Sequence, residues 1–536
     1  MEAKRKTKIV VTLGRKSTSK EMLVQLIRSG MDIARISNRF LTIDRKEVLK
    51  NLKEAVELTG VQVGVMLGLR ESDMRLYSFD TDSVLELKEG DLVKVVTSSD
   101  LNLEGNVIRC NNKEFPDLVK PGDKLLIDFG KVEFSVVSVE SITHSMSKTL
   151  IDLQALNTTL WNFNRQLNCR QELSFEVPRI PKSNSYNAIQ RPKRKHPKSP
   201  KFPKVVLCRV ETDCLFTAHK PVHICPVNSK ETPISYATDI EDIKAIEWAA
   251  QNSIDFVVYK QVRDAEDLST LLNFYLPQTK RFVGIQNKNS VDIMEEIITE
   301  GDGVVVGRGM LALETSLPQV FRIQKTIVKR CNELAKPVVI STQLLESMVS
   351  NSRPSRSEVT DITNAVLDGC DALILTGETA YGENPVRALE ACSKICIEAE
   401  RYLDYQKHLD YILRTLGSNI SVAENICYCA VRSVLSLKAA LIVCTTESGK
   451  TAQIISRFLP PCPILALTNS QRVLRQLKIV RGVFPSFLEN PSEVLQRTFE
   501  IAEEFAVSGD ILVFVGGSHN EFCQGKTCSF KILCMP

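Results

Sequence analysis

The feature that most constrains this chain is a repeated pattern of short apolar strands separated by longer amphipathic stretches. Most of the intervals have a helical pattern, and residues 319–335 place apolar side chains three and four positions apart. Near-continuous apolar strands that alternate with helices are typical of a parallel (β/α)8 barrel, the TIM barrel. Eight such strands are expected, at residues 8–14, 33–37, 62–69, 254–260, 281–286, 303–309, 337–342 and 372–379.

Two regions depart from the barrel pattern. Residues 77–220 are rich in polar–apolar alternation and turns, which predicts an inserted all-β (B) domain. Its basic, Pro-rich segment 191–204 is expected to be a solvated linker, with a nuclear address or an anion-binding arm as alternatives. Residues 393–536 predict a small C-terminal α/β domain, with strands at 439–446, 463–468 and 509–517 and helices that begin at Thr451 and Gln471. The barrel (A) domain is therefore expected to comprise residues 1–76 and 221–392.

Composition and charge exclude several classes of protein. The formal net charge of +4 gives no strong field for nucleic acid or an anionic membrane. The amino-terminal residues pass from charged side chains directly into a strand, unlike a signal peptide, and no apolar run approaches the roughly 18 residues of a membrane span. The sequence thus predicts a cytoplasmic protein with neither a nucleic-acid nor a membrane partner.

Cysteine is frequent but shows no metal-binding spacing. The chain has 16 cysteines, none in a CxxC pair, and most lie in apolar segments such as "LIVCTTES". Buried free thiols in a reducing compartment are expected. Zinc binding is the alternative, and the paired spacing that it requires is missing.

Three stretches of sequence resemble the pyruvate kinase family. "TKIVVTLGRKS" (7–17) is similar to its opening strand, and "SGMDIARIS" (29–37) resembles its second strand. "KPVVISTQLLESM" (336–348), together with residues 353–385, matches the family almost without a break. The resemblance implies a barrel with a β insert in its third βα loop and an α/β tail. It also implies the family's glycolytic reaction, phosphoryl transfer from phosphoenolpyruvate to ADP to give pyruvate and ATP.

The family's divalent-metal site is altered in this chain. In the family, the Glu of a Lys-Ile-Glu strand end and the Asp of an Arg-Gly-Asp-Leu-Gly turn bind the metal, and that Lys neutralises the transferring phosphoryl group. Here the Lys and Glu positions are Gly284 and Gln286, and the turn "RGMLA" places Met310 at the Asp position. The resemblance implies Mg²⁺ and K⁺ as cofactors, but an amide and a thioether are poor Mg²⁺ ligands, so no metal ligand is expected.

The family's monovalent-cation site is altered as well. In the family it uses an Asn and a Ser of Arg-Leu-Asn-Phe-Ser-His-Gly and an Asp-Thr pair on strand three. This chain has Ser37 and Arg39 at the first two positions, Phe40 at the His, and Gly68 and Leu69 at Asp-Thr. The Arg39 guanidinium is suited to the volume of a bound cation, and an exposed loop arginine is the alternative.

Other positions in the matched motifs keep the residues that the family uses. Arg35 and Arg75 align with arginines that contact phosphate groups, and Thr342 aligns with the Thr that ends strand seven near the substrate methylene. Arg308 and Gly309 keep the turn that holds the substrate carboxylate. The alternative roles are structural, with Arg35 and Arg75 as ion-paired barrel residues and Thr342 as a helix cap.

Two lysines are candidates to replace the missing one. Lys260 ends strand four, where the family has a small Ser, and neighbours the Gly284 position, while Lys288 lies just beyond strand five. No comparable replacement is visible for the metal ligands, and Glu314 is expected to be structural. Removing one preorganised electrostatic donor typically raises a barrier by about 3–4 kcal/mol. Loss of the Lys and both metal ligands therefore predicts a fall in turnover of many orders of magnitude.

A loop in the C-terminal domain resembles the family's sugar-phosphate effector loop. "CTTESGKTA" (444–452) places hydroxyls and a lysine between a strand and a helix, where backbone N–H groups favour phosphate, and an ordinary helix cap is the alternative. Residues 515–522 lack the family's Trp-Arg-Pro-Gly loop, and Glu447 adds a negative charge. The candidate residues are Thr446, Ser448, Gly449, Lys450 and Thr451.

These observations predict a catalytically impaired family member, either a pseudoenzyme or a regulatory or assembly subunit. The family is tetrameric, and "RPSRSEVTDITNAV" (353–366) resembles one of its interfaces. A homo-oligomer or a hetero-oligomer with an active homologue is therefore expected, with small phosphorylated ligands as possible partners. Two alternatives stay open: an active pyruvate kinase with a rearranged cation site, and a sensor of phosphorylated ligands without turnover.

Overall fold

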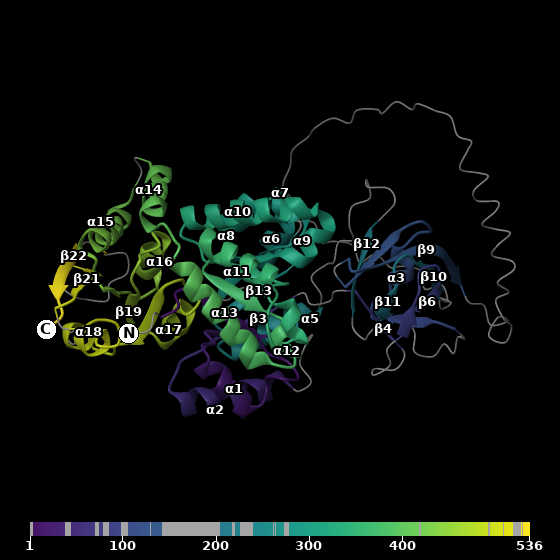
Figure 1. Ribbon diagram of the computed structural model, residues 1–536, viewed down its shortest axis with the longest axis horizontal. Helices are drawn as coiled ribbons and strands as arrows, with labels where there is room; N and C mark the ends of the chain where they lie inside the picture. Colours follow the sequence, from purple (N-terminus) through teal and green to yellow (C-terminus); the bar gives the residue numbers. More distant parts are fainter. Residues whose placement is uncertain are drawn as a thin grey trace, which may run out of the picture. The chain divides into compact units, whose positions relative to one another are not determined.

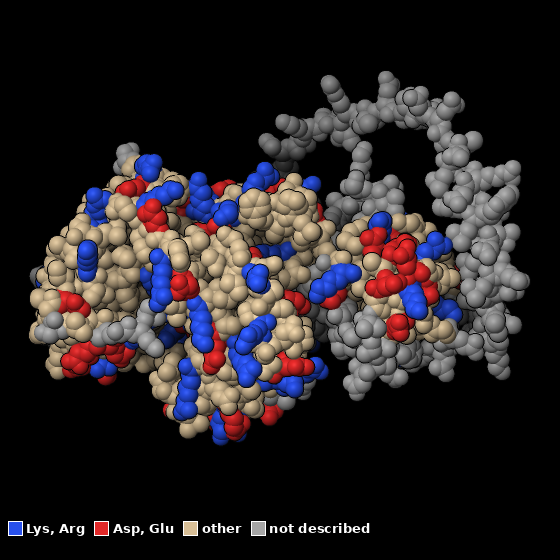
Figure 2. Space-filling model, in the orientation of Figure 1, with Lys and Arg blue, Asp and Glu red and all other residues tan. Residues whose placement is uncertain are grey.

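The computed structural model divides the chain into two compact units, Met1–Asp73 with Ser235–Pro536, and Met74–Ile234 (Figure 1). The residues it describes are 4–37, 44–69, 74–78, 85–97, 105–128, 130–141, 204–216, 220–225, 240–260, 262, 264–272, 278–417, 420–490, 494–507, 509–517, 527 and 529–536. On the faces that Figure 2 shows, basic and acidic side chains are interspersed. None of the described helices is both long and apolar enough to cross a membrane.

The first unit contains a closed barrel of eight parallel strands in the order β1-β17-β16-β15-β14-β13-β3-β2. Each predicted strand forms one barrel strand, so the predicted TIM barrel is confirmed. The strands are β1 (Lys8–Thr12), β2 (Ile33–Ile36), β3 (Gly64–Gly68), β13 (Phe256–Tyr259), β14 (Lys280–Ile285), β15 (Gly303–Gly307), β16 (Val338–Ser341) and β17 (Ala372–Leu375). All eight end before the predicted limit, and after β15 and β17 a helix begins within two residues, at Arg308 and Gly377.

Helices surround the barrel strands (Figure 1). Local capping sets where several begin. The Ser19 side chain accepts the Met22 N–H at the start of α1, and Ser355 and Glu358 form a capping box on α11. The helices are α1 (Lys20–Arg28), α2 (Arg45–Thr59), α5 (Ile240–Gln251), α6 (Ala265–Leu272), α7 (Lys288–Asp292), α8 (Met294–Glu300), α9 (Arg308–Glu314), α10 (Leu317–Glu333), α11 (Arg356–Asp368), α12 (Gly377–Ala380) and α13 (Pro385–Glu400), with a 3-10 turn at Glu346–Val349.

An aspartate immediately before every second barrel strand ties neighbouring strands together at the amino-terminal end, here called the base. Each accepts the N–H of a residue at the start of the preceding strand, at 2.9 Å in all four cases. Each therefore bridges one pair of adjacent strands, β1 with β2, β3 with β13, β14 with β15, and β16 with β17. The bonds run from Ile9 to Asp32, Val65 to Asp255, Arg281 to Asp302, and Val338 to Asp371.

A five-stranded sheet in the order β20-β19-β18-β21-β22 forms the C-terminal domain. The predicted strands β18, β19 and β21 are present, whereas β20 and β22 were not predicted. The helix expected from Thr451 begins one residue earlier, because Gly449 is its N-cap. The elements are α14 (Tyr405–Leu416), α15 (Val422–Leu437), β18 (Leu441–Thr445), α16 (Lys450–Arg457), β19 (Ile464–Thr468), α17 (Gln471–Leu477), β20 (Val483–Phe487), α18 (Val494–Ala502), β21 (Ile511–Gly516) and β22 (Ser529–Cys534).

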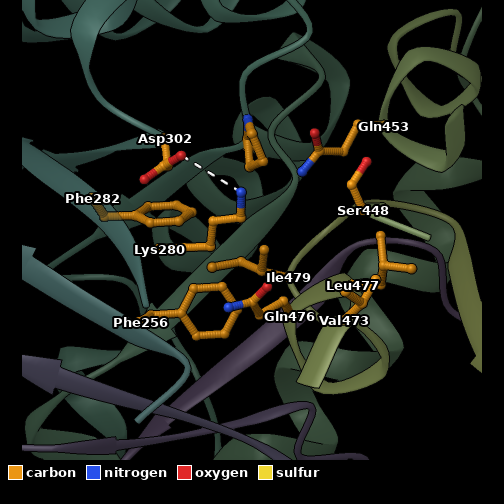
Figure 3. Close-up of a pocket in the computed structure, with 11 residues that line it drawn as sticks. Phe256, Lys280, Phe282, Asp302, Ser448, Gln453, Val473, Gln476, Leu477 and Ile479 are labelled. Atoms are coloured by element: carbon orange, nitrogen blue, oxygen red, sulfur yellow. Dashed lines mark ion pairs between the residues drawn. The ribbon is translucent and has the colours of Figure 1, made fainter. Parts of the chain in front are cut away.

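The C-terminal domain packs on the base of the barrel. Arg475 of α17 donates through Nε to both carboxylate oxygens of Asp255, at 3.0 and 3.1 Å, and Asp255 is fully buried. Beside this contact lies a cavity of about 10 Å³, the size of one water molecule. Figure 3 shows Lys280 in this cavity with its ammonium directed toward Asp302, at 3.6 Å, while Ser448 approaches from the C-terminal domain.

The second unit is the predicted all-β insert. Seven of its strands close into a small barrel in the order β10-β6-β7-β4-β12-β8-β9, and β5 pairs with β11. Residues 191–203 of the basic segment lie outside the described residues, and Lys204 begins β10; the domain boundaries stay predictions. The elements are β4 (Arg75–Ser78), β5 (Leu85–Leu87), β6 (Leu92–Val96), β7 (Val107–Cys110), α3 (Phe115–Leu118), β8 (Lys124–Ile127), β9 (Val132–Ser141), β10 (Lys204–Val210), β11 (Cys214–Phe216) and β12 (Lys220–Cys225).

Candidate functional site

Strand alternation defines which residues line the carboxyl-terminal end of the barrel, the usual active-site end of this fold. The last buried apolar residue of each strand that faces the barrel interior is Val10, Ile33, Met66, Val258, Phe282, Val305, Val339 or Ile374. The residue two positions later faces the same side. These eight described positions, here called the mouth layer, are Thr12, Arg35, Gly68, Lys260, Gly284, Gly307, Ser341 and Thr376. The layer thus has two cations, three hydroxyls and three glycines, and no carboxylate.

Arg35 is a buried member of the mouth layer, with 6% of its surface exposed. The parallel pairing of β1 and β2 sets it opposite Thr12, and its Nη1 donates to Thr12 Oγ1 at 3.1 Å. The guanidinium has five N–H donors in a planar fork that suits phosphate and carboxylate oxygens. A phosphate-binding role for Arg35 is compatible with this position and stays a prediction.

Lys260 and Gly284 lie side by side in the mouth layer. A Cβ placed on Gly284 would lie 3.5 Å from Lys260 Cα and 3.2 Å from the Tyr259 carbonyl oxygen. Lys260 itself is half-buried. The structure therefore brings together the vacant lysine position and the lysine that the sequence offered as its replacement.

Gln286 covers part of the mouth layer. Its Cβ and Oε1 both lie 2.8 Å from where a Cβ on Gly307 would be, so any larger residue at 307 would displace this side chain. The half-buried Met310 lies on the next segment. The sequence suggested a turn with Met310 near its tip; instead, Arg308, Gly309 and Met310 form the first turn of α9, because the helix begins directly after Gly307.

Arg308 and Gly309 hold the loop that follows β16. Arg308 Nη1 donates to Asp361 Oδ1 at 2.6 Å, and Nη2 donates to the carbonyls of Thr342 and Gln343, both at 3.0 Å. The Gly309 N–H donates to Thr342 Oγ1 at 2.8 Å. Both terminal nitrogens of Arg308 thus bond within the protein, whereas its buried Nε has no hydrogen-bond partner among the described residues.

Thr342 also makes its visible bonds within the protein. Its hydroxyl donates to the Ser341 carbonyl at 2.6 Å while it accepts from Gly309, so Thr342 caps the first turn of α9 from the neighbouring strand. Thr342 and Gln343 have φ of 73° and 53°, a left-handed conformation that is costly for a β-branched residue. In this arrangement the hydroxyl proton points to a backbone oxygen rather than to a ligand.

Two carboxylates that follow barrel strands at this end, Glu378 and Glu314, bond to the backbone. Glu378 accepts the Leu345 N–H at 3.0 Å and the Thr376 N–H at 2.6 Å, one on each oxygen. Glu314 accepts the N–H of the exposed Lys288 at 3.1 Å, so it fixes the start of α7 and is structural in this respect. Such carboxylates are occupied by hydrogen bonds and are poor candidates for a metal.

The residues present do not fit the family's divalent or monovalent cation. Gln286 and Met310 offer an amide and a thioether, and no group of three or more His, Cys, Asp or Glu is placed to hold a metal anywhere in the described part of the chain. Within that same part, the buried Ser37 hydroxyl has no hydrogen-bond partner, while Gly68 and Leu69 bring no side-chain oxygen beside it.

For three further predicted residues, the structure describes no side-chain position at the site. Arg39 and Phe40 lie outside the described residues. Arg75 begins β4 in the second unit, and its predicted contact with phosphate stays a prediction. What the sequence missed at this end is the hydroxyl content of the mouth layer, Thr12, Ser341 and Thr376. Strand alternation predicts these residues, because each lies two positions after an apolar residue that faces the barrel interior.

The predicted effector loop is partly committed to its own fold. Gly449 has φ of 86° and donates its N–H to Thr446 Oγ1 at 2.9 Å, while Thr451 Oγ1 bonds to Thr527 Oγ1 at 2.9 Å. Ser448 and Lys450 are exposed. Ser448 and Lys450 are therefore the two predicted effector-loop residues that are exposed to solvent near the start of α16.

The cysteines that the structure describes are free thiols, and most are buried. Burial is the main cause that raises the pKa of Cys427 and of Cys462 to about 12 each. Such thiols are protonated at neutral pH and unreactive, as expected for core residues.

Comparisons with known proteins agree with this geometry. One family model, "Pyruvate kinase, barrel domain", matches residues 4–170 and 198–389, and a second, "Pyruvate kinase, alpha/beta domain", matches residues 424–533. A pyruvate kinase of Dictyostelium discoideum is 30% identical over 98% of this chain and 94% of its own length. The cytosolic isozyme of pyruvate kinase from Glycine max is 31% identical over 86% of this chain and 79% of its own length. The solved structure of Cryptosporidium parvum pyruvate kinase in complex with ADP is 28% identical, covers 100% of this chain and 97% of its own, and has a TM-score of 0.79.

Proposed function

Because the chain belongs to the pyruvate kinase family, we propose that it is a member with little or no phosphotransfer that serves as a binding, regulatory or assembly subunit. The family reaction transfers a phosphoryl group from phosphoenolpyruvate to ADP. One observation carries the proposal: the mouth layer has no carboxylate, and Gly284, Gln286 and Met310 stand where the family has its Lys, Glu and Asp. Each replacement removes charge that the phosphoryl transition state requires.

The expected size of the loss in catalytic rate supports this proposal. A single preorganised electrostatic donor contributes about 3–4 kcal/mol to catalysis. Three such groups are replaced together, and even strong non-additivity leaves a deficit of many orders of magnitude. The hydroxyl of Thr342, which donates to the Ser341 carbonyl, supplies no compensating proton donor in this arrangement.

The second candidate function is an active kinase with a rearranged site. The position of Lys260 next to Gly284 favours it, because an ammonium of a different strand could take over the lost charge. No described carboxylate is placed to restore the metal, and for this reason we rank this function second.

A third candidate is a sensor of phosphorylated ligands. Ser448 and Lys450 are exposed at the start of α16, where backbone N–H groups favour an anion. Thermal melting with phosphoenolpyruvate, ADP and sugar phosphates tests it, since a ligand that binds the folded state raises the melting temperature. The absence of a shift with all of them would remove this candidate.

For its assembly, we propose a homo-oligomer or a hetero-oligomer with an active homologue in the cytoplasm. Leu317 and Phe321 lie one turn apart on α10 with 75% and 61% of their surface exposed, as expected for an unpartnered contact face. Purification from native cells tests mixing, and recovery of a single polypeptide would contradict the hetero-oligomer.

The deciding experiment is pyruvate release from phosphoenolpyruvate and ADP by the purified full-length chain, with Mg²⁺ or Mn²⁺ and with or without K⁺. The Lys260→Ala variant and an active relative are assayed in parallel. We expect both forms of this chain to remain at background. Turnover near that of the active relative would overturn the proposal, and its loss in Lys260→Ala would identify the rearranged kinase instead.

A further inference from the structure

Residues 5–8 lead into β1 and contact the C-terminal domain at the base of the barrel, and this contact is here called the seam. We propose that Lys6 and Lys8 make the seam a pH-sensitive switch, in which loss of a proton from either ammonium strengthens the docking of the C-terminal domain on the barrel. The inference goes beyond the proposed function and does not rest on it, because the seam lies at the opposite end of the barrel from the mouth layer.

Lys6 lies among neutral acceptors. Its Nζ donates to the Tyr405 hydroxyl at 2.8 Å and to the Pro461 carbonyl at 2.6 Å, and it lies 4.7 Å from the centre of the Tyr405 ring. The Tyr405 hydroxyl itself donates to the Glu400 carbonyl at 2.8 Å, so its oxygen accepts from Lys6. An ammonium has three N–H donors and a neutral amine has two. These two acceptors therefore suit the neutral amine, and neither of them is a carboxylate that would favour the charged form.

Lys8 shares its acid with another cation. It lies two positions before Val10 on β1, so it faces the barrel interior at the base, and only 2% of its surface is exposed. Its Nζ is 4.0 Å from Asp32 Oδ1 and 4.3 Å from the centre of the Phe484 ring of β20. Asp32 is already paired with Arg5 Nη2 at 2.9 Å. The charge of Lys8 is therefore buried with only part of a counter-charge.

Cations outnumber acids around the two lysines. With the lysines themselves included, the charged groups are five cations and two acids. Like charges repel, and burial reduces the screening that water provides. Loss of one proton thus removes repulsion together with part of the cost of burying a charge. The groups that face Lys6 are Glu400, Tyr405, Cys462 and Arg481, and those that face Lys8 are Arg5, Asp32, Glu400 and Lys478.

The remaining hydrogen bonds of the seam do not correct this imbalance. The Glu400 carboxylate accepts the N–H groups of Lys6 and Thr7 and the Thr7 hydroxyl, so it is engaged by the backbone at its own end of the cluster. The Arg481 guanidinium is 2% exposed, and its Nε and Nη2 have no hydrogen-bond partner among the described residues. The seam therefore buries positive charge that its own acids do not match.

The pKa values of the two lysines agree with this geometry. Burial, together with Arg481, lowers the pKa of Lys6 from 10.5 to about 8. Burial also lowers the pKa of Lys8 from 10.5 to about 8, against the opposing effect of Asp32. Between about pH 8 and 10.5 the unfolded chain then binds more protons than the folded chain, so the contribution of each lysine to stability is gained as pH rises.

The test is urea unfolding of the full-length chain under reducing conditions at pH 7, 8 and 9. Lys6→Met and Lys8→Met are the test variants, because methionine does not titrate and keeps an apolar stem of similar length. Lys4→Met is the matched control, since Lys4 is exposed and pairs with Glu504 of the C-terminal domain at 2.9 Å. Buried thiols also make stability depend on pH, so the quantity compared is the ratio of the unfolding constants of wild type and variant, in which that dependence cancels.

From pH 7 to 9 we expect the unfolding constant of the wild type to fall about tenfold relative to that of each test variant, and to change by less than about twofold relative to that of the control. Lys6→Gln, which keeps an N–H donor, replaces Lys6→Met if that variant does not fold. A ratio that is independent of pH for both lysines, or an equal change in the control, would overturn the inference.

Hydrogen exchange locates the effect at the seam. The Arg481 N–H donates to Asp371 Oδ1 at 3.0 Å, and the Gly482 N–H donates to the Lys6 carbonyl at 2.9 Å, so both report docking of the C-terminal domain. Their protection, corrected for the intrinsic rate at each pH, should rise in the wild type relative to the test variants by about the same tenfold. A change in the unfolding ratio without this rise in protection would show that the lysines do not act on docking and would overturn the inference.

Discussion

The two ends of the barrel use charge in opposite ways. At the base, four aspartates precede alternate strands, and each accepts a backbone N–H from the strand before it at 2.9 Å. At the mouth, the eight positions of the uppermost layer contain no acid. The base therefore carries acids that hold the fold, whereas the mouth layer carries two cations and no acid.

This difference shows that closure of the barrel does not depend on acids at its mouth. Strand pairing, the aspartate bonds and the apolar interior are complete although Gly284, Gln286 and Met310 stand at the reacting end. In TIM barrels the carboxyl ends of the strands carry chemistry and the amino ends carry stability, and here the base has four aspartates while the mouth layer has Arg35 and Lys260 and no acid. The following predictions are ways to break or sharpen that contrast.

The largest effect is expected from Asp255→Ala at the base. Asp255 is fully buried and accepts from Val65 and Arg475, so its removal leaves a buried N–H and a cation without their partner. We expect the free energy of unfolding in urea to fall by about 3–5 kcal/mol. Glu398→Ala, which breaks an exposed pair with Arg401, is the control and should change it by less than about 0.5 kcal/mol. A loss below about 1 kcal/mol for Asp255→Ala would contradict the structural role of the base.

The second prediction concerns pH and Asp371. Burial raises the pKa of this carboxyl from 3.8 to about 6. Between these values the folded chain holds a proton that the unfolded chain has released, so this group's contribution to stability is present at low pH and is lost as pH rises toward 6. The change amounts to about 3 kcal/mol.

Urea unfolding of the wild type and of Asp371→Asn at pH 4 to 7 tests this expectation. Because asparagine does not titrate, the difference in unfolding free energy between the two should shift in favour of the wild type by about 3 kcal/mol as pH falls. If the unfolding free energies of the two proteins changed with pH in parallel from pH 4 to 7, Asp371 would have an ordinary pKa in the folded chain.

The third prediction restores acids at the mouth. Gln286→Glu combined with Met310→Asp returns two hard oxygen ligands beside Gly307, so we expect Mn²⁺ to bind at least about tenfold more tightly than in the wild type, a gain of about 1.4 kcal/mol. Calorimetry or Mn²⁺ resonance measures it. Gln286→Glu with Met310→Leu serves as the control with one acid. If the pair of acids gains nothing, the geometry of the mouth rather than the ligand type excludes the metal.

The smallest effect is expected from Lys260→Met. Lys260 is half-buried, and methionine keeps an apolar stem of similar length in place. We expect the free energy of unfolding to change by less than about 1 kcal/mol, measured in urea as for Asp255→Ala. A loss above about 2 kcal/mol would show that Lys260 stabilises the fold, as the aspartates of the base do. The contrast between the two ends of the barrel would then be weaker.

Much of the fold could be predicted because each barrel strand is an apolar run of its own. The missed strands lack that signal: β20 contains Pro485 and is only partly buried, and β22 is an edge strand with an exposed Ile532. The aspartate bonds of the base were not predictable, because their partners are separated by 21 to 190 residues in sequence.

The candidate site was predictable in part. The altered motifs identified Gly284, Gln286 and Met310, and spacing along strand four identified Lys260. The sequence did not show that the Thr342 hydroxyl accepts a hydrogen bond from the Gly309 N–H and donates one to the Ser341 carbonyl. It also did not show that Gln286 covers Gly307. Those contacts depend on how neighbouring strands and helices approach in three dimensions, and no local pattern encodes them.

The three glycines of the mouth layer have a consequence for protein design. The barrel closes through its base and interior, so a new functional group at the mouth has to fit only its local neighbours. At Gly307 a new side chain would require Gln286 to move, and at Gly284 it would press on the Tyr259 carbonyl oxygen, so a design begins by changing those neighbours.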